Sequence, residues 1–212
     1  MKLSEKNWLI EQESFGVSHK HETCFALTNG YIGIRGINEE VFCDEIPGTF
    51  IAGVFDKDTA QVTELVNLPN PIGLRIYINR EYLNPLKCEV LEFRRVLDLK
   101  QGLLFRKLRL KDEKGRITSI EGFRFVSMKN KNLIVQKYNV VCENYSAVLN
   151  VESFIDAATV NSKDVPNDRV KHYEVEDKKD CKSCIFLEIT TKDKRYKVGI
   201  ASSTEVLLNG HK

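Results

Sequence analysis

Several common features are missing from this 212-residue sequence. No stretch approaches about 18 consecutive apolar residues, so we expect no membrane-spanning helix. The N-terminus, Met1–Ile10, carries charges where a secretory signal peptide has its apolar region, so the cytoplasm is the expected location. Charge of one sign is not in excess, because 32 basic and 30 acidic residues give a net charge of +2. Neither nucleic acid nor a membrane surface is therefore an expected partner.

A helical period and internal repeats are also missing. No window of about eleven residues or more places apolar side chains at the 3.6-residue spacing of an amphipathic helix. Short stretches alternate between apolar and polar residues instead, and turn signals separate them about every 8–12 residues, which is typical of a sandwich. The sequence is 42% hydrophobic, enough for a sizeable core. We predict an all-β fold: a large antiparallel β-sandwich with little helix, forming a single domain over residues 1–212.

The alternation predicts individual strands. Leu74, Ile76 and Ile78 alternate with polar neighbours, and Asn79-Arg80 is a candidate turn back into Glu81–Leu83. Leu104, Leu108 and Leu110 share one face of a later strand. The polar stretch Glu11–His21 is expected to be a loop or a single turn, and 161–167 a surface loop. The other predicted strands are Trp8–Ile10, Phe50–Phe55, Val62–Leu68, Leu103–Leu110, Arg116–Ser127, Leu133–Cys142, Ala147–Ile155, Val170–Glu176, Cys184–Thr190, Tyr196–Ser202 and Glu205–Leu208.

The six cysteines suggest no metal centre. In a cytoplasmic protein we expect reduced, mostly buried thiols, with Cys88 and Cys142 filling the core. Cys181 and Cys184 form a lone C-x-x-C, whereas a structural zinc site needs four ligands and usually a second such pair. We expect neither metal nor redox function there.

Other candidate chemistry is equally weak. His19 and His21 could offer two zinc ligands if they lay on a strand, but no third ligand is identifiable. Gly30, Gly33 and Gly36 lack the spacing, the lysine and the following helix of a phosphate-binding loop. No pair of carboxylates has an arrangement that would mark it for cleaving a sugar bond. We therefore assign no catalytic, cofactor-binding or metal-binding residue.

The stretch Glu22–Gly36 is the most informative part of the chain. Two apolar runs, Phe25–Leu27 and Tyr31–Ile34, flank Asn29-Gly30, which predicts a β-hairpin with a type I′ turn.

Glycines and charges in this hairpin suggest close packing. Gly33 and Gly36 indicate a bulge or a close approach of two backbones. Glu22 and Arg35 are expected to form a buried or interface ion pair, with contact to a ligand as the alternative. Trp8, Tyr31 and Tyr77 could present stacking faces to a sugar, although scattered aromatic residues in a β-rich chain more often belong to the core.

The same stretch resembles the N-terminal domain of glycoside hydrolase family 65, whose early signature reads E-[ST]-x-F-x-[LV]-x-N-G-Y-[LI]-G-x-R-G. The segment Pro47–Asp56 is similar to a second family motif, G-T-[YF]-x-A-G-x-[YF]-[DN], and Glu64–Pro69 to a third, E-L-V-N-[LA]-P. Asn144-Tyr145-Ser146 matches a further segment, and the details look most similar to the kojibiose-phosphorylase-like branch. The residues that fill the first signature are Glu22, Thr23, Phe25, Leu27, Asn29, Gly30, Tyr31, Ile32, Gly33, Arg35 and Gly36.

The resemblance implies a super-sandwich like that of galactose mutarotase, followed in the family by a helical linker and a catalytic (α/α)6 barrel. The family contains both disaccharide phosphorylases and hydrolases. The resemblance implies phosphorolysis of an α-glucosyl disaccharide to β-glucose 1-phosphate and glucose, with inorganic phosphate as co-substrate and no cofactor, and leaves hydrolysis as the alternative. The expected partners are that barrel, the disaccharide and a second copy in a homodimer, and this chain alone is expected to be inactive.

Four residues are candidates for facing the barrel or an interface: Glu22, Arg35, Asn67 and Asn70. The strand-like Val206–Leu208 leads into a turn signal at Asn209-Gly210 just before Lys212, so we expect a domain truncated at its C-terminal end. A stand-alone carbohydrate-binding β-sandwich is the alternative.

Overall fold

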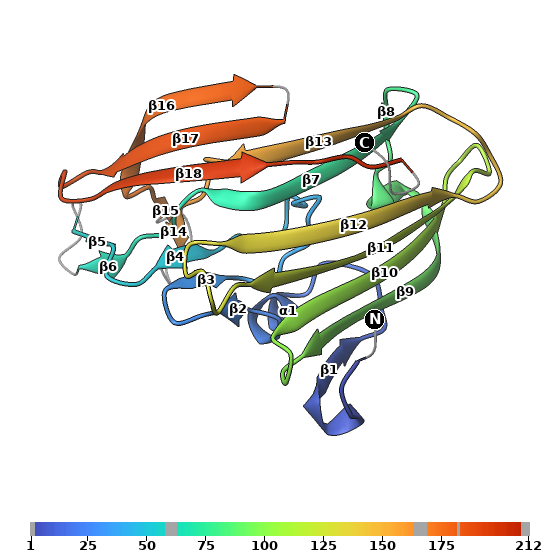
Figure 1. Cartoon of the computed structure of the whole chain (residues 1–212), viewed down its shortest axis with the longest axis horizontal. Helices are drawn as coiled ribbons and strands as arrows, with labels where there is room; N and C mark the ends of the chain where they lie inside the picture. The colour runs from blue at the N-terminus through green and yellow to red at the C-terminus, as the bar shows by residue number, and fades with distance from the viewer. Residues whose placement is uncertain (1–2, 58–62, 163–168, 182, 209–212) are drawn as a thin grey trace. The chain divides into compact units, whose positions relative to one another are not determined.

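The structure is a computed structural model that describes residues 3–57, 63–162, 169–181 and 183–208. Strands account for 52% of it and helix for 6%, and strands of both larger sheets pair antiparallel (Figure 1). The predicted all-β antiparallel fold with little helix is confirmed. No helix among the described residues has the length and apolar character needed to cross a membrane.

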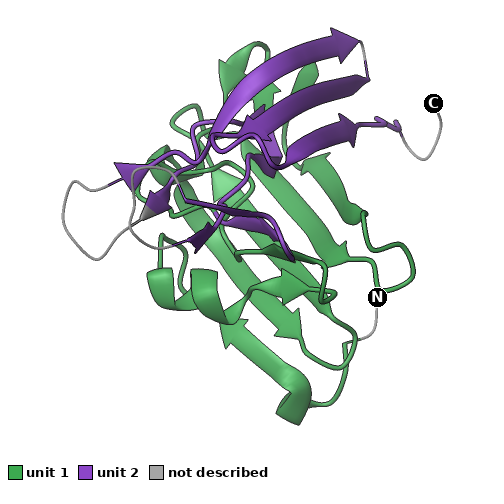
Figure 2. Cartoon of the chain, turned by 90° about the vertical axis from the view of Figure 1, so that its left-hand side faces the viewer, with its two compact units in different colours: residues 1–47, 75–152 green, residues 48–74, 153–212 purple. Residues whose placement is uncertain are grey.

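The chain divides into two compact units, coloured separately in Figure 2. Unit 1 comprises Met1–Pro47 and Arg75–Glu152, and unit 2 comprises Gly48–Leu74 and Ser153–Lys212. The chain passes from one unit to the other within β7 (Asn70–Ile78) and β13 (Leu149–Asp156).

The remaining elements fall within one unit each. Unit 1 contains η1 (Lys6–Trp8), β1 (Leu9–Gln12), α1 (His19–Cys24), β2 (Leu27–Thr28), β3 (Ile32–Ile34), β8 (Glu81–Tyr82), η2 (Pro85–Lys87), β9 (Glu89–Asp98), β10 (Leu103–Lys111), β11 (Ile117–Val126) and β12 (Ile134–Cys142). Unit 2 contains β4 (Thr49–Ile51), β5 (Phe55–Asp56), β6 (Glu64–Leu65), β14 (Asn161–Ser162), β15 (Arg169–Val170), β16 (Tyr173–Cys181), β17 (Cys184–Thr191) and β18 (Lys197–Ser203).

A five-stranded sheet with the order β1-β9-β10-β11-β12 forms the centre of unit 1. Side chains alternate between its two faces, so Leu104, Leu108 and Leu110 of β10 lie on the buried face as predicted. Ile120 of β11 pairs with Leu108 and joins the same apolar cluster, together with Ile76 from β7. Burial of this one face fixes the register of the whole sheet.

Unit 2 has a smaller sheet with the order β16-β17-β18. Leu187 and Ile189 of β17 pack with Tyr173 of β16. Val66 and Leu68, which come from the other segment of unit 2, complete this second core and are fully buried. Each unit therefore has its own apolar cluster.

Two predicted turns differ in type. At Asn79-Arg80, where the sequence predicts a turn, both residues have positive φ, 51° and 70°, and Ile78 pairs with Glu81, which is the pattern of a type I′ hairpin. The earlier hairpin also forms, but its turn lies one residue later than predicted. Its central residues are Gly30 and Tyr31, and only Gly30 has positive φ, the sign pattern of a type II′ turn.

Several predicted boundaries were wrong. Phe50–Phe55 is not one strand, because Gly53 adopts φ +88° and a turn separates β4 from β5. Residues 19–24 form helix α1, which Ser18 caps by accepting a hydrogen bond from the His21 backbone. Glu205–Leu208 contains only a single bridge residue, Leu208. Residue 62 and most of the predicted loop 161–167 lie outside the described residues, as does the turn at Asn209-Gly210.

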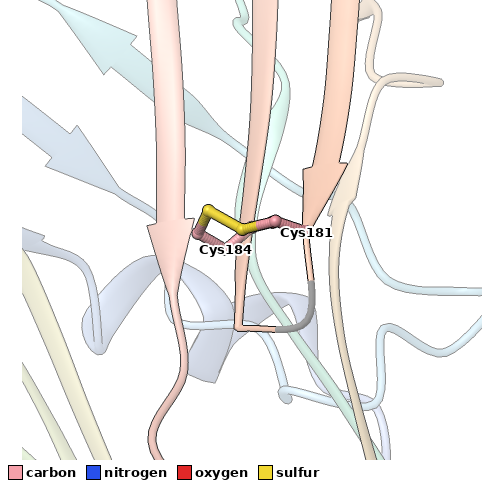
Figure 3. The surroundings of a disulfide bond; sticks show 2 residues. All are labelled: Cys181 and Cys184. Atoms are coloured by element: carbon pink, nitrogen blue, oxygen red, sulfur yellow. A yellow bond between two sulfur atoms is a disulfide. The ribbon is translucent and has the colours of Figure 1, made fainter.

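The cysteines also differ from expectation. Cys181 and Cys184 form a disulfide at the turn between β16 and β17 (Figure 3). Their Cα atoms lie 5.2 Å apart, within the range a disulfide spans. The four free cysteines, Cys24, Cys43, Cys88 and Cys142, are exposed or partly exposed. The prediction of reduced, mostly buried thiols was therefore wrong. Two of the six are joined to each other, Cys24 ends helix α1, and Cys142 ends the outermost strand β12.

Candidate functional site

The segment directly after the hairpin, residues 36–47, carries three acidic side chains into the interior of unit 1. Glu39, Glu40 and Glu45 are each at most 7% exposed. Facing them are three arginines that are only 1–2% exposed: Arg95, Arg106 and Arg124. We call these six residues the buried ion-pair network, after the ion pairs that join Arg106 to Glu39 and Glu40 and Arg124 to Glu39.

The sheet places the three arginines side by side. Arg95 and Arg106 are direct partners across β9 and β10. Arg124 lies on β11, where it pairs with Leu104, two residues before Arg106 on the same face of β10. Buried charged residues need partners, and the planar guanidinium suits buried ion pairs better than an ammonium does.

Arg106 connects the two consecutive acids of the segment. Its Nη1 donates to Glu39 Oε2 at 2.7 Å and to Glu40 Oε2 at 2.8 Å, and its Nη2 donates to Glu40 Oε1 at 3.0 Å. Arg124 Nη1 lies 3.4 Å from Glu39 Oε1. Glu39 is thus held from two strands of the sheet, and Glu40 from one.

The other arginine contacts hold the backbone of the segment. Arg95 Nη2 donates to the carbonyls of Gly36 and Ile37, and Arg124 Nη2 donates to the Ile37 carbonyl at 3.0 Å. The Arg95 guanidinium also lies over the Phe25 ring, 5.2 Å from its centroid. The start of the segment is therefore fixed by contacts with rigid strands.

Glu45 closes the segment on itself. Its carboxylate accepts hydrogen bonds from the backbone and side-chain nitrogens of Asn38 at 2.6 and 2.7 Å, and from the Phe42 backbone at 2.9 Å. Cys43, Asp44 and Ile46 remain exposed at the tip. The result is a rigid loop with a few exposed residues.

Burial and charge move the pKa values of this network in different directions. Burial pushes the pKa of Glu39 upward, but the charges of Arg124, Arg106 and Arg95 outweigh it and bring that pKa down to about 2. Burial raises the pKa of Glu45 to about 7, in spite of its hydrogen bonds. Burial also lowers the pKa of Arg95 to about 10. Glu39 is hence a permanent anion near neutral pH, whereas Glu45 titrates there.

Glu22 and Arg35 form the ion pair that the sequence predicted. Arg35 Nη2 donates to Glu22 Oε2 at 3.0 Å, with the Glu22 side chain 2% exposed and that of Arg35 27% exposed. Gly36 confirms the predicted close backbone approach, since its N–H donates to the Glu22 carbonyl at 2.7 Å. A Cβ at Gly36 would lie 2.4 Å from Phe25 Cβ.

Asn67 and Asn70 lie in unit 2 and are buried within it. Asn67 Oδ1 accepts a hydrogen bond from the Thr49 backbone at 3.0 Å, and its Nδ2 donates to the Val160 carbonyl at 2.9 Å. Asn70 Oδ1 accepts from the Ile72 backbone at 3.4 Å. In this chain both amides organise backbone, and their side chains are not part of its surface.

The remaining sequence candidates are not brought together. His19 and His21 lie on helix α1, so the premise that they share one face of a strand was wrong. His19 Nδ1 contacts Glu22 and His21 Nδ1 contacts Ser18. Among the described residues, no cluster of three or more histidine, cysteine, aspartate or glutamate side chains is suited to a metal ion.

In this geometry the network holds the chain's own 36–47 segment. Arg106 binds the Glu39 and Glu40 carboxylates, whereas Arg95 and Arg124 bind backbone carbonyls of the segment. The chain is an all-β antiparallel protein with an N-terminal hairpin, and this is its structural class. Comparison with known families then assigns it: residues 10–212 match the model of "Glycosyl hydrolase family 65, N-terminal domain". The chain belongs to this family.

Several of its relatives are named as phosphorylases. A kojibiose phosphorylase from Caldanaerobacter subterraneus subsp. tengcongensis is 44% identical over 207 residues, which cover 96% of this chain and 27% of that protein. An alpha,alpha-trehalose phosphorylase from Thermoanaerobacter brockii is 26% identical over 182 residues, covering 78% of this chain and 24% of that protein. The chain spans about a quarter of the length of the curated relatives it matches.

A solved structure has the same fold. A protein from the human microbiome, assigned as a kojibiose phosphorylase, superposes with a TM-score of 0.74 over 94% of this chain and 27% of that one. The two sequences are 20% identical over the match, so this likeness supports the fold alone.

Sequence reasoning missed the buried ion-pair network. One signal was available, because Leu104, Leu108 and Leu110 form a buried row that skips position 106. The residue in that gap, Arg106, must point inward with its neighbours. Two acids side by side at Glu39 and Glu40, just after the glycine-rich hairpin, were the complementary signal.

Proposed function

We propose that this chain is the N-terminal β-domain of a phosphorylase-like enzyme of family 65, forming a wall of its substrate cleft or part of a dimer interface. The reaction is phosphorolysis of an α-glucosyl disaccharide to β-glucose 1-phosphate and glucose, in the cytoplasm, with inorganic phosphate as co-substrate and no cofactor. The reacting groups belong to an (α/α)6 barrel outside residues 1–212. The names of the relatives and the chain's share of their length support this assignment.

We infer that the chain positions part of the substrate cleft, and the supporting observation is how firmly the 36–47 segment is bound to the sheet of unit 1. Three buried guanidiniums fix its start, while its tip stays exposed. Groups that shape a substrate cleft must be held to within fractions of an ångström on rigid elements. A loop fixed by buried ion pairs, with exposed residues at its tip, meets that requirement.

Arg35 is the member of the four candidate residues best placed to meet another domain. Its side chain is partly exposed, and the buried Glu22 carboxylate fixes its position. In this proposal Asn67 and Asn70 do not contact the other domain themselves. They hold the backbone around residues 67–71 in place. The exposed Ile46 extends the proposed contact surface beside Arg35, since the Ile46 N–H lies 3.4 Å from Glu22 Oε2.

The first experiment tests the chain alone. The purified chain is incubated with kojibiose, trehalose, maltose or nigerose, with and without phosphate, and free glucose and β-glucose 1-phosphate are assayed. We expect no turnover, because inversion at a sugar carbon needs an acid and a phosphate site held on opposite sides of the bond. Turnover that one carboxylate-to-amide substitution within this chain abolishes would overturn the proposal.

The second experiment tests the positioning role. In a chimera, the chain replaces the matching N-terminal quarter of the Caldanaerobacter relative, and phosphorolysis of kojibiose is measured. We expect Arg35→Ala to lower kcat/KM by about tenfold or more, since small displacements of positioning groups are costly. Arg94→Ala is the matched control, because Arg94 forms a similar, partly exposed ion pair with Glu11 at 3.1 Å. Equal activity of the two variants would contradict the role of Arg35.

The alternative function, a stand-alone carbohydrate-binding module, has a different outcome. It would be favoured if the chain binds sugar but the chimera shows no turnover.

A further inference from the structure

Unit 1 contains a hollow that is lined in part by residues of the 36–47 segment, Glu40–Cys43. It has a volume of about 270 Å³ and lies where the β7–β8 hairpin meets the 36–47 segment. Binding pockets for drug-sized ligands usually exceed about 300 Å³, so this hollow suits one small ring. All of its lining residues belong to unit 1.

Two tyrosines form one wall of the hollow. Tyr77 and Tyr82 are direct cross-strand partners, with ring centroids 5.6 Å apart and ring planes inclined by 46°. Tyr77 Oη donates to Glu152 Oε2 at 2.7 Å, which fixes the first ring. The Arg75 guanidinium lies 5.9 Å from the centroid of Tyr82 and fixes the second. The rings are therefore held in place before any ligand arrives.

Two residues that line the hollow each have a hydrogen-bonding group without a partner among the described residues. Asn84 Oδ1 accepts a hydrogen bond from the Leu86 backbone at 3.0 Å, which orients the amide, but its Nδ2 has no partner within the described part of the chain. The Tyr82 hydroxyl also has no hydrogen-bond partner among the described residues. Polar groups next to an aromatic wall favour a ligand that combines apolar faces with hydroxyl groups.

The 36–47 segment supplies further lining residues of the hollow, and its backbone is strained at one of them. Val41 has φ +53°, a left-handed conformation that is a genuine outlier for a β-branched residue. Such conformations persist only where the surroundings hold them, and they cluster at ligand clamps and active sites. Here the neighbouring Glu40 is held by Arg106, so this part of the lining is preformed.

We propose that this hollow is a binding site for a single neutral sugar ring, with Tyr77 and Tyr82 contacting the ring and Tyr82 Oη and Asn84 Nδ2 binding its hydroxyls. The charged groups at the hollow are matched by the protein itself: Arg75 lies 3.7 Å from Glu152, and Glu40 is paired with Arg106. An anionic ligand would find no unmatched positive charge. The proposal rests on the proposed function only for the choice of sugars tested.

The test is binding, measured on the 212-residue chain by saturation-transfer NMR and titration calorimetry with methyl α-glucoside and maltose. We expect a Kd in the millimolar range, because an open hollow leaves part of the sugar hydrated. Tyr82→Phe keeps the ring and removes the hydroxyl, and should weaken binding several-fold; Asn84→Ala should do the same. Tyr31→Ala, which removes a tyrosine that does not line the hollow, should leave binding unchanged.

Three results would overturn the site. They are no saturation transfer to either sugar, equal binding by Tyr82→Phe and wild type, or tighter binding of inorganic phosphate than of sugar at the same residues. Because no phosphorolysis is measured, failure here leaves the proposed function standing. Conversely, loss of the chimera's activity would leave this binding result unaffected.

Discussion

The two units bury different kinds of polar group. In unit 1 most of the buried polar side chains are charged, and the three guanidiniums of the ion-pair network face glutamates. In unit 2 most of them are neutral: Tyr173 Oη, for example, shares a hydrogen bond of 2.7 Å with Thr159. Its buried imidazole, His172, lies between Asp56 at 2.8 Å and Glu64 at 3.1 Å.

This difference shows what each unit can tolerate. A buried ion pair gives little net stability relative to apolar residues, but loss of one partner leaves an uncompensated charge. A neutral hydrogen bond contributes about 1 kcal/mol and costs less to break. Unit 1 is therefore expected to be more sensitive to change, and the sensitive point lies at the base of the 36–47 segment.

The largest effect is expected from Arg106→Met. This change leaves Glu39 and Glu40 buried without their shared cation, and it should reduce the free energy of unfolding by about 3–5 kcal/mol. Urea unfolding followed by the fluorescence of Trp8, the chain's one tryptophan, which lies in unit 1, measures the change.

Arg109→Met provides the matched control. Arg109 is three residues further along β10 and is ion-paired with Glu143 at 2.7 Å, but its side chain is 37% exposed. Surface pairs contribute little, so we expect no substantial change. Equal destabilisation by the two substitutions would show that burial of the network does not determine its importance.

The second prediction concerns pH. The pKa of Glu45 is raised to about 7 in the folded chain, above its ordinary value of 4.5, so the folded state binds this proton more tightly than the unfolded state. The resulting stability is fully present below pH 4.5 and is lost as pH rises through 7. Glu39, with its lowered pKa, acts in the opposite sense, and its contribution is lost as pH falls from 4.5 towards 2.

Unfolding measured across this pH range should separate the two acids. Glu45→Gln removes the loss between pH 4.5 and 7, a difference on the order of 1–3 kcal/mol. Asp44→Asn, one residue away and exposed, controls for removal of a carboxylate charge at the tip. A profile for Glu45→Gln that runs parallel to that of the wild type would exclude Glu45 as the titrating group.

The sequence could predict strands whose buried row is apolar, because a period of two is visible in β7 and β10. It could not predict β9, where Arg95 occupies a buried position and Arg94 beside it is partly exposed. A charged residue is ordinarily assigned to the solvent face. Arg95 therefore interrupts the apolar alternation of β9, and Arg106 leaves a gap in the row of leucines on β10. Helix α1, with six residues, is too short to show a period, and its Ser18 cap was the available signal.

The candidate residues were predictable to different degrees. Glu22 and Arg35 could be paired from their positions at the two ends of one hairpin. Asn67 and Asn70 were selected from a family motif, and only the structure shows that their side chains are buried. The hollow beside Tyr77 and Tyr82 depends on how the 36–47 segment meets a hairpin about forty residues later, which no local pattern contains.

The smallest effect compares two tightly packed glycines, one in each unit. A Cβ at Gly36 would lie 2.4 Å from Phe25 Cβ and 2.8 Å from the Phe25 backbone carbonyl, neither of which can move without shifting the chain. A Cβ at Gly73 would lie 2.5–2.6 Å from the ring of Phe154, a side chain that can rotate away. Overpacking costs about 1–3 kcal/mol. We expect Gly36→Ala to fall at the upper end of that range and Gly73→Ala at the lower end.

Gly33→Ala is the control for this pair, because its Cβ would meet Thr28 Oγ1 at 3.8 Å, an ordinary contact. Thermal unfolding of the three variants measures the differences, with the order of destabilisation expected to be Gly36, then Gly73, then Gly33. The same order should appear in hydrogen exchange of the Gly36 and Phe25 amides, which loosen only if the backbone itself has moved. If Gly73→Ala were the more destabilising change, side-chain packing in unit 2 would be less adaptable than the hairpin of unit 1. The contrast between a rigid first unit and a more tolerant second one would then be wrong.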